Sequence, residues 1–303
     1  MTLVIVLYAL LASTFTLGKA ALFYFKPFFF IGLRMVPAGL ILLGYLYFFR
    51  RESFVFHRKD VWLFLQVILF HIYATFLLEF WALQYLTSSK ACLLYNTSPF
   101  LAAIFSYFFF KEVLTRKKFV GLLVGFLGFL PIMLTEGPQE ASLPEISFLS
   151  SAEIVLLLSV VTSVYGWILM REMVKIRGYS PLMVNGTAML GGGILSFITA
   201  YFFEPSPILA TSTTELLTGL SYTGLMIIIA NMIFYNLYGY LLHFYSATWL
   251  AFVGFIAPLF AALYGWFFLH EHIGWAYFVS MVIVFWGLYL FYREELRQGY
   301  ITR

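Results

Sequence analysis

A histidine, a threonine and a carboxylate follow one another at helical spacing inside a long apolar run. His71, Thr75 and Glu79 are four residues apart, so in an α-helix each is turned by about 40° from the one before and all three share one stripe. A carboxylate in such a run can pair with a cation, bind the amine of a substrate or carry a coupling proton. Arg34, in an earlier apolar run, is the candidate cation. It could pair with Glu79 or hold the carboxylate or phosphate of a substrate.

Polar side chains interrupt other apolar runs at positions where a substrate could meet them. Two pairs, Ser163 with Trp167 and Asn231 with Tyr235, have the four-residue spacing that places both members on one helix face. Lys19 ends the first apolar run, where its amine could also extend to the membrane surface. The predicted substrate-binding residues are Lys19, Arg34, His71, Glu79, Tyr95, Asn96, Ser163, Trp167, Asn231 and Tyr235.

The composition places these candidates in a membrane. The 303 residues are 62% hydrophobic, 21% aromatic and only 11% charged, whereas a soluble domain carries about 25% charged residues. The single cysteine, Cys92, excludes an internal disulfide and a multi-cysteine metal site. No cofactor and no metal are expected, and the absence of a phosphate-binding loop motif gives no indication of ATP-driven transport.

Apolar runs of about 20 residues are long enough to cross a bilayer as helices. The sequence predicts ten such spans, at residues 3–22, 28–49, 61–86, 88–110, 119–134, 152–171, 181–203, 215–243, 246–269 and 273–292. The expected fold is therefore an all-α integral membrane protein with ten transmembrane helices. An even number of spans places both termini on the same side of the bilayer.

The basic residues predict which side that is. All of them except Lys19, Lys26, Arg34 and Lys90 fall in the loops at 50–59, 111–118 and 171–177 or in the tail from Arg293 onward. These segments lie on one face of a ten-span protein, and loops rich in Lys and Arg stay in the cytoplasm. We therefore expect a multi-pass protein of the cell (inner) membrane with both termini cytoplasmic. The net charge of +4 reflects this orientation, so no nucleic-acid partner is expected.

The chain contains an internal repeat. "SPFLAAIFSYFFFKE" (98–112) aligns with "APLFAALYGWFFLHE" (257–271) at a constant offset, which matches Pro99 with Pro258 and Glu112 with Glu271. Each half then holds five spans, and an odd number of spans inverts the second half in the membrane. We predict two inverted five-helix repeats, 1–134 and 152–303, joined by an external linker at 135–151. Inverted repeats typically enclose a central cavity at the bilayer midplane.

Pro99 and Pro258 are predicted to break the fourth and ninth spans at matching positions. A proline removes one backbone N–H and disrupts its helix by a turn. Paired breaks of this kind favour a transport site, although an ordinary proline kink is the alternative, since membrane helices tolerate proline.

Residues 82–130 resemble the EamA-type signature of the drug/metabolite transporter superfamily. The resemblance lies in a small-residue helix start, the proline within "YNTSPFLAAIF", a glutamate at the helix end and a glycine-spaced next helix. A weaker copy covers 246–290, and "LGKAALFYFKPFFFIGLRM" (17–35) is similar to the first two helices of the family. Lys111 and His270 depart from the small residue that commonly precedes the glutamate. The resemblance implies ten helices, cytoplasmic termini, a central cavity and transport of small metabolites.

The predicted function is a secondary transporter that carries a small polar metabolite by alternating access. The intramembrane carboxylate and cation favour an amino-acid-type zwitterion, and the resemblance adds amino acids and S-adenosylmethionine as candidates. Nucleotide-sugar or multidrug transport is the alternative. A channel remains open, whereas an enzyme lacks support because no HExxH motif or cluster of carboxylates is present. The expected partners are the substrate, the lipid bilayer and a coupling proton or counter-substrate, for a monomer or homodimer.

Overall fold

The computed structural model describes residues 2–86, 91, 94–128, 130–131, 145–146, 149–257, 259–260, 263–264 and 275–299. The first half contributes α1 (Thr2–Ala21), α2 (Pro27–Phe49), α3 (Val61–Gln66), η3 (Val67–Ala74), α4 (Thr75–Leu83), α6 (Ser98–Phe110) and α7 (Arg116–Leu127). The second half contributes α9 (Ser151–Arg171), η4 (Glu172–Ile176), α10 (Pro181–Phe203), α11 (Thr213–Met226), η5 (Ile227–Phe234), α12 (Tyr235–Leu241), α13 (Ala247–Val253), η6 (Gly254–Ile256) and α15 (Trp275–Arg297). Two short 3-10 turns, η1 (Arg51–Ser53) and η2 (Arg58–Asp60), follow α2.

The protein is an all-α membrane protein of the expected kind, with about ten helices. Six continuous helices are long and apolar enough to cross a bilayer: Leu3–Ala21, Pro27–Phe49, Arg58–Leu83, Ser151–Ile176, Pro181–Phe203 and Thr213–Leu241. Shorter apolar helices, Ser98–Phe110 and Ala247–Ile256, occupy the predicted fourth and ninth spans. The helices α7 and α15 occupy the fifth and tenth. Each of the ten predicted spans therefore holds helix within the described residues.

A small departure from the all-α expectation precedes α9. Strands β1 (Glu145–Ile146) and β2 (Leu149–Ser150) pair antiparallel, with Ile146 opposite Leu149. Ser150 then caps the start of α9 with a capping box. Its hydroxyl accepts a hydrogen bond from the Glu153 amide, and the Glu153 carboxylate accepts one from the Ser150 amide. The hairpin therefore directs the chain into the sixth span.

The fourth span is interrupted where the sequence places its polar patch. Residues 94–95 are helical, Asn96 and Thr97 form a turn, and α6 begins at Ser98. Pro99 therefore lies in the first turn of a helix, where its missing N–H has no intrahelical partner to lose. Its predicted counterpart, Pro258, lies outside the described residues.

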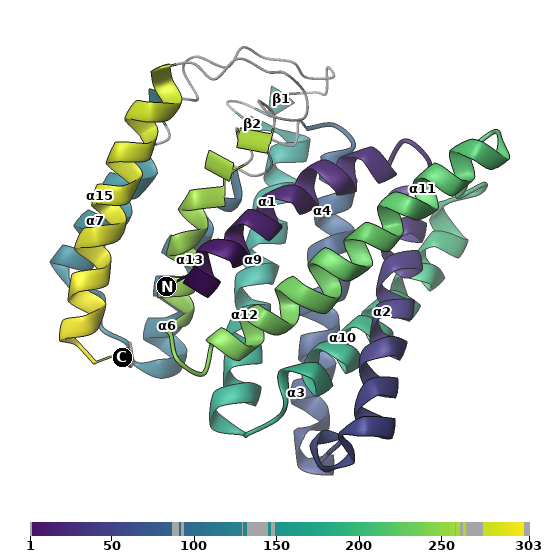
Figure 1. The fold of residues 1–303 in the computed structure, drawn as a ribbon, viewed down its shortest axis with the longest axis horizontal. Coiled ribbons are helices and arrows are strands. Elements are labelled where there is room, and N and C mark those ends of the chain that lie inside the picture. Colours follow the sequence, from purple (N-terminus) through teal and green to yellow (C-terminus); the bar gives the residue numbers. More distant parts are fainter. Residues whose placement is uncertain are drawn as a thin grey trace.

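Two helix pairs join the halves of the chain through close backbone contacts. The most extensive contacts among the described elements are between α2 and α10 and between α7 and α15, and Figure 1 shows α7 beside α15 at one edge of the bundle. A Cβ added at Gly39 would lie 2.5 Å from the Leu190 nitrogen, and one at Gly287 would lie 2.6 Å from the Gly125 nitrogen. Glycines at these contacts therefore allow the backbones of the two halves to approach closely.

A side chain of the second half caps the start of α2. The carboxylate of Glu204, which follows α10, accepts hydrogen bonds from the amides of Phe28 and Phe29 at 2.9 and 2.8 Å. Burial raises the pKa of this carboxyl, while the two amides and Lys26 act in the opposite direction. The contact fixes the end of the α2 and α10 pair.

Ion pairs hold the opposite end together. We call this the basic end, since it carries the loop cations at 50–59, 111–118 and 171–177. Arg171 at the end of α9 pairs with Glu112 after α6 at 2.5 Å, Lys118 of α7 pairs with Glu295 of α15, and Arg177 pairs with Asp60 at 2.7 Å. Each pair joins residues of the first half to residues of the second.

Candidate functional site

A cavity of about 110 Å³ lies between the two halves of the chain. Helices α1, α2, α4 and α6 line it from the first half, and α9, η5, α12 and α13 line it from the second. Its charged and hydrogen-bonding side chains include Arg34, Thr75, Glu79, Tyr95, Asn96 and Ser163. A pocket shared between halves is where a carrier with two repeats is expected to hold its substrate.

The Glu79 carboxylate accepts a hydrogen bond from Tyr95, next to a hydrogen bond that joins the two halves. The Tyr95 hydroxyl donates to Glu79 Oε2 at 2.6 Å and lies 3.1 Å from the Ser159 hydroxyl. The Ser159 hydroxyl in turn donates to the Thr75 carbonyl at 2.9 Å. Because each hydroxyl has one proton, Tyr95 donates to Glu79 and Ser159 donates to Thr75, and neither hydroxyl donates to the other. Among the described residues no hydrogen bond is made to Glu79 Oε1, and Glu79 lines the cavity.

Arg34 is buried in a bed of phenylalanine rings. Its guanidinium carbon lies 4.5 Å from the Phe76 ring centre, 5.2 Å from Phe80 and 5.7 Å from Phe30. The residue is only 1% exposed, and its Nε and Nη2 have no hydrogen-bond partner among the described residues. Cation–π contacts stabilise the charge but leave the donors unsatisfied. Nε and Nη2 of Arg34 are therefore hydrogen-bond donors without an acceptor in the described part of the cavity wall.

Arg34 and Glu79 do not form an ion pair with each other in the described part of the chain, although both line the same cavity. The alternative of a structural pair, which the sequence left open, is thus not realised in this conformation. Charges buried in a membrane normally pair or face water. Two separated, opposite charges in one cavity are complementary to a ligand that carries both an anion and a cation.

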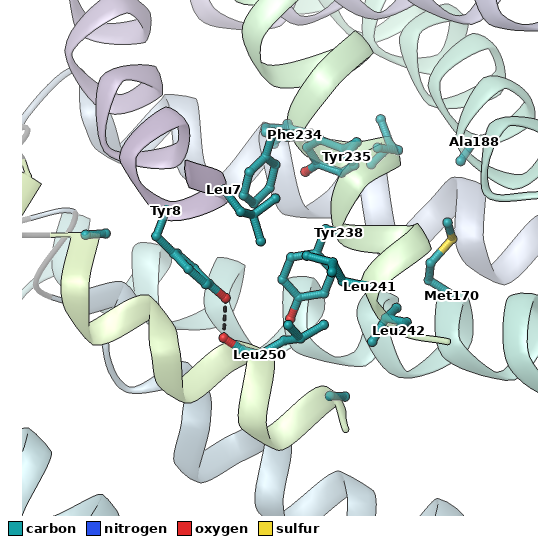
Figure 2. Packing of buried hydrophobic residues seen from close by; sticks show 14 of the residues in the cluster. Leu7, Tyr8, Met170, Ala188, Phe234, Tyr235, Tyr238, Leu241, Leu242 and Leu250 are labelled. Carbon is teal, nitrogen blue, oxygen red and sulfur yellow. Dashed lines mark hydrogen bonds between the residues drawn. The ribbon is translucent and has the colours of Figure 1, made fainter. Parts of the chain in front are cut away.

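Aromatic rings form the part of the cavity that lies toward the basic end. The Trp167 ring stacks on Tyr235 with 5.2 Å between centroids and lies 3.8 Å from Tyr238. Figure 2 shows Tyr8 of α1 directing its hydroxyl to the Leu250 carbonyl of α13, with Tyr238 beside it. These rings close the cavity with apolar faces and phenol edges, which suits a planar group.

The structure brings most of the predicted site residues together. Arg34, Glu79, Tyr95, Asn96, Ser163, Trp167 and Tyr235 line the cavity. Lys19, His71 and Asn231 do not. The half-buried Lys19 donates instead to the carbonyls of Leu83 and Leu86 at 2.8 and 2.5 Å, where it caps the end of α4.

Sequence reasoning missed two cavity residues of the first helix and one of α12. Tyr8, Phe15 and Tyr238 line the cavity, and Phe15 meets Tyr95 edge to face at 5.4 Å. Apolar residues occur on every side of α1, so its sequence carries no clear periodicity that would have identified the inner face.

A bundle of apolar helices around a shared cavity with opposite charges is the architecture of a membrane carrier. The chain belongs to the EamA-like transporter family, whose sequence profile matches residues 1–134 and 150–293. It is a multi-pass membrane transporter of a small polar metabolite.

Several proteins are similar over most of the chain. The chain is 37% identical over 294 residues to the S-adenosylmethionine/S-adenosylhomocysteine transporter of Chlamydia muridarum (strain MoPn / Nigg), which covers 96% of this chain and 90% of that protein. It is 36% identical over 297 residues to the protein of the same name from Chlamydia trachomatis serovar L2, covering 96% and 88%. Protein PecM of Dickeya dadantii is 24% identical over 271 residues, covering 87% and 82%. A solved crystal structure shares the fold with a TM-score of 0.73 at 16% identity, over 98% of this chain and 96% of that one.

Proposed function

We propose that the protein is a secondary carrier of S-adenosyl amino acids of the S-adenosylmethionine and S-adenosylhomocysteine type. The observation that carries the proposal is the separation of Arg34 from Glu79 within one cavity. An α-amino acid group presents a carboxylate and an ammonium on neighbouring atoms. The carboxylate would accept from Arg34 Nε and Nη2, and the ammonium would donate to Glu79.

The aromatic wall supports a substrate that carries a planar ring. Trp167, Tyr235 and Tyr238 lie together on the part of the cavity wall that α9 and α12 contribute. A nucleoside attached to the amino acid would lie against these rings while its zwitterionic end meets the charges. The names of the two chlamydial relatives describe a substrate of this kind.

The charges favour this substrate over a nucleotide sugar. A diphosphate carries about two negative charges and is normally held by several Arg or Lys side chains. Arg34 is the one Arg or Lys on the described cavity wall. A single guanidinium opposite a carboxylate fits one carboxylate and one amine. We propose no catalytic role for the site, in keeping with a family of transporters.

We further propose that the two halves are inverted repeats that expose the cavity alternately to each side. The basic end would face the cytoplasm of a cell that keeps the protein in its inner membrane, since Lys and Arg gather in cytoplasmic loops. Coupling would occur by exchange of one substrate for another or by a proton. After replacement of Cys92, a cysteine within 137–148 should react with an impermeant reagent added to intact cells. One within 111–118 should not, and the reverse pattern would contradict the orientation.

The test of substrate recognition uses two ligands that differ only in the amino-acid part. S-adenosylhomocysteine carries it, whereas 5′-methylthioadenosine does not. Binding to the purified protein is measured by calorimetry for wild type, Arg34→Gln and Glu79→Gln. We expect each substitution to weaken S-adenosylhomocysteine binding by about 30-fold or more, the effect of removing one buried charged partner. Binding of 5′-methylthioadenosine, which lacks both charges, should change by less than about threefold.

Lys26→Gln and Glu215→Gln serve as matched controls, because each removes one charge outside the cavity wall. Both should bind like wild type. If Arg34→Gln and Glu79→Gln keep wild-type affinity for S-adenosylhomocysteine, the zwitterion is not recognised by these residues. If wild type binds neither ligand but binds a nucleotide sugar, the proposed substrate class is wrong.

A further inference from the structure

Two of the three π-helical segments among the described residues occupy matching places in the two halves, and the third, η4, continues α9 at the basic end. Segment η3 (Val67–Ala74) lies between α3 and α4, and segment η5 (Ile227–Phe234) lies between α11 and α12. Both contain eight residues, and their bounds are separated by 160 positions, one more than the repeat offset of the fourth and ninth spans. The π-helix is rare and is found mostly at functional sites. Its presence at equivalent depths of two spans indicates a shared role.

Each segment carries one buried polar side chain at its fifth residue, His71 in η3 and Asn231 in η5. Their exposed fractions are 1% and 0%. Both ring nitrogens of His71 and Oδ1 of Asn231 lack a hydrogen-bond partner among the described residues. The amide nitrogen of Asn231 meets only sulfur, at 3.0 Å from Met35 and 3.6 Å from Met189. Unsatisfied polar atoms inside a membrane protein are costly, so they are expected to be satisfied in another state.

Side chains just after each segment donate hydrogen bonds to backbone carbonyls within it. The Thr75 hydroxyl donates to the Phe70 carbonyl, five residues earlier, at 2.6 Å. The Asn236 amide donates to the Asn231 carbonyl, also five residues earlier, at 3.0 Å. These bonds occupy carbonyls that a regular α-helix would use for its own ladder. These side-chain hydrogen bonds thus stabilise the π-helical turns, and backbone amides can replace them as donors.

Cavity residues follow directly after both segments. Thr75, Phe76 and Glu79 follow η3, and Tyr235 and Tyr238 follow η5. A shift of one residue in helical register turns everything beyond it by about 100° and moves it by about 1.5 Å. Conversion of η3 from π to α would therefore rotate Glu79 relative to Arg34, and conversion of η5 would rotate the aromatic wall.

We propose that η3 and η5 change register during transport, and that His71 and Asn231 are positioning residues whose unpaired polar atoms gain hydrogen bonds in the rewound state. His71 also contacts the rings of Trp167 and Tyr235 at 4.4 and 5.3 Å, so its movement is transmitted to the cavity wall. The proposal rests on the transport function but not on the identity of the substrate.

The test replaces each polar side chain by an apolar one of similar size, His71→Phe and Asn231→Leu. Unpaired polar atoms are removed from the present state, so the unfolding temperature in detergent should stay equal or rise. The affinity for S-adenosylhomocysteine should change by less than about twofold. Counterflow of labelled S-adenosylhomocysteine into proteoliposomes should slow by about tenfold or more, because the rewound state loses its hydrogen bonds.

Thr223→Val is the matched control. Thr223 lies 3% exposed in α11, one turn before η5, and its hydroxyl bonds to its own helix at the Gly219 carbonyl. This variant should transport like wild type. Wild-type counterflow in both His71→Phe and Asn231→Leu would overturn the proposal. So would a loss of counterflow that merely parallels a lower unfolding temperature, since that result describes a structural role.

Amide hydrogen exchange of the ligand-free wild-type protein gives a second test that needs no variant and no substrate. Amides of 67–74 and 227–234 should exchange about tenfold faster than those in the middle of α10, because rewinding transiently breaks their bonds. Equal protection of the π-segments and α10 would overturn the proposal. Absence of ligand binding in the wild type would contradict the proposed substrate without affecting this measurement.

Discussion

The ion pair between Glu112 and Arg171 offers a sharp test of how the halves are joined at the basic end. Glu112 follows α6 and Arg171 ends α9, with 2.5 Å between Oε1 and Nη2. The two side chains are 6% and 8% exposed. The substitution Glu112→Gln removes the negative charge and leaves the shape of the side chain nearly unchanged. Arg171 then remains buried without a carboxylate at its guanidinium.

The expected cost follows from the burial of both partners. Removing one member of a buried ion pair costs about 3–5 kcal/mol, because the remaining charge is uncompensated. The Arg171 guanidinium keeps its place 4.2 Å from the Phe110 ring centre, and a cation–π contact of this kind retains about 1–2 kcal/mol of its stabilisation. We therefore expect a loss near the lower limit, about 3 kcal/mol. For a chain of this length that corresponds to a decrease of about 6 °C in the unfolding temperature.

The assay is thermal unfolding in detergent, followed by tryptophan fluorescence, for Glu112→Gln, Arg171→Gln and the double variant. Each single variant should unfold at a lower temperature, and the double variant should recover most of the loss, because no unpaired charge remains. Glu172→Gln is the control, since Glu172 pairs at 3.2 Å with Arg177 and these two side chains are 26% and 39% exposed. Its cost should be below about 1 kcal/mol. Additive losses in the double variant would refute the reasoning, because additivity means that the two residues do not interact.

Three further substitutions test particular contacts. Lys19→Met should lower the unfolding free energy by about 1–3 kcal/mol through loss of two charged hydrogen bonds at the end of α4. A loss of substrate affinity without a loss of stability would instead mean that Lys19 contacts the substrate. Gly39→Ala should destabilise the protein by about 1–3 kcal/mol, since its Cβ would meet the backbone of Leu190. Gly44→Ala on the same helix is the control, because the space around Gly44 is open. It should be neutral or stabilising in the same unfolding assay. Pro99→Ala should change stability by less than about 1 kcal/mol, because a proline in the first turn of a helix replaces an N–H without an intrahelical partner, and a larger destabilisation would mean that the ring itself shapes the turn at 96–97.

Much of the architecture could be predicted because the bilayer imposes length and charge on a sequence. Apolar length located the span at 181–203 to the residue, since its limits coincide with those of α10. Arg34 and Glu79 stood out because an ionisable residue in an apolar run is rare and has to face protein or water. Both lie on the cavity wall, as the sequence led us to expect.

The direction of other polar side chains could not be predicted. Lys19, His71 and Asn231 lie at suitable depths but contact α4 carbonyls, aromatic rings and methionine sulfur. Sequence gives the depth of a residue, whereas its direction depends on helix rotation. The π-segments add a second difficulty, because an extra residue per turn alters the direction of everything beyond it. The four-residue spacing of His71, Thr75 and Glu79 therefore did not place all three at the cavity.

The close glycine contacts between α2 and α10 and between α7 and α15 have a consequence for membrane insertion and assembly. Gly39 of α2 contacts α10, and Gly121 and Gly125 of α7 contact Gly287 of α15, so the smooth faces of α2 and α7 stay exposed until the second half has left the ribosome. The first five spans would thus be inserted before the helices that pack against these glycine faces, and the faces would stay available to bind α10 and α15. Two polypeptides cut between 134 and 152 and synthesised together should therefore find each other and assemble into one carrier.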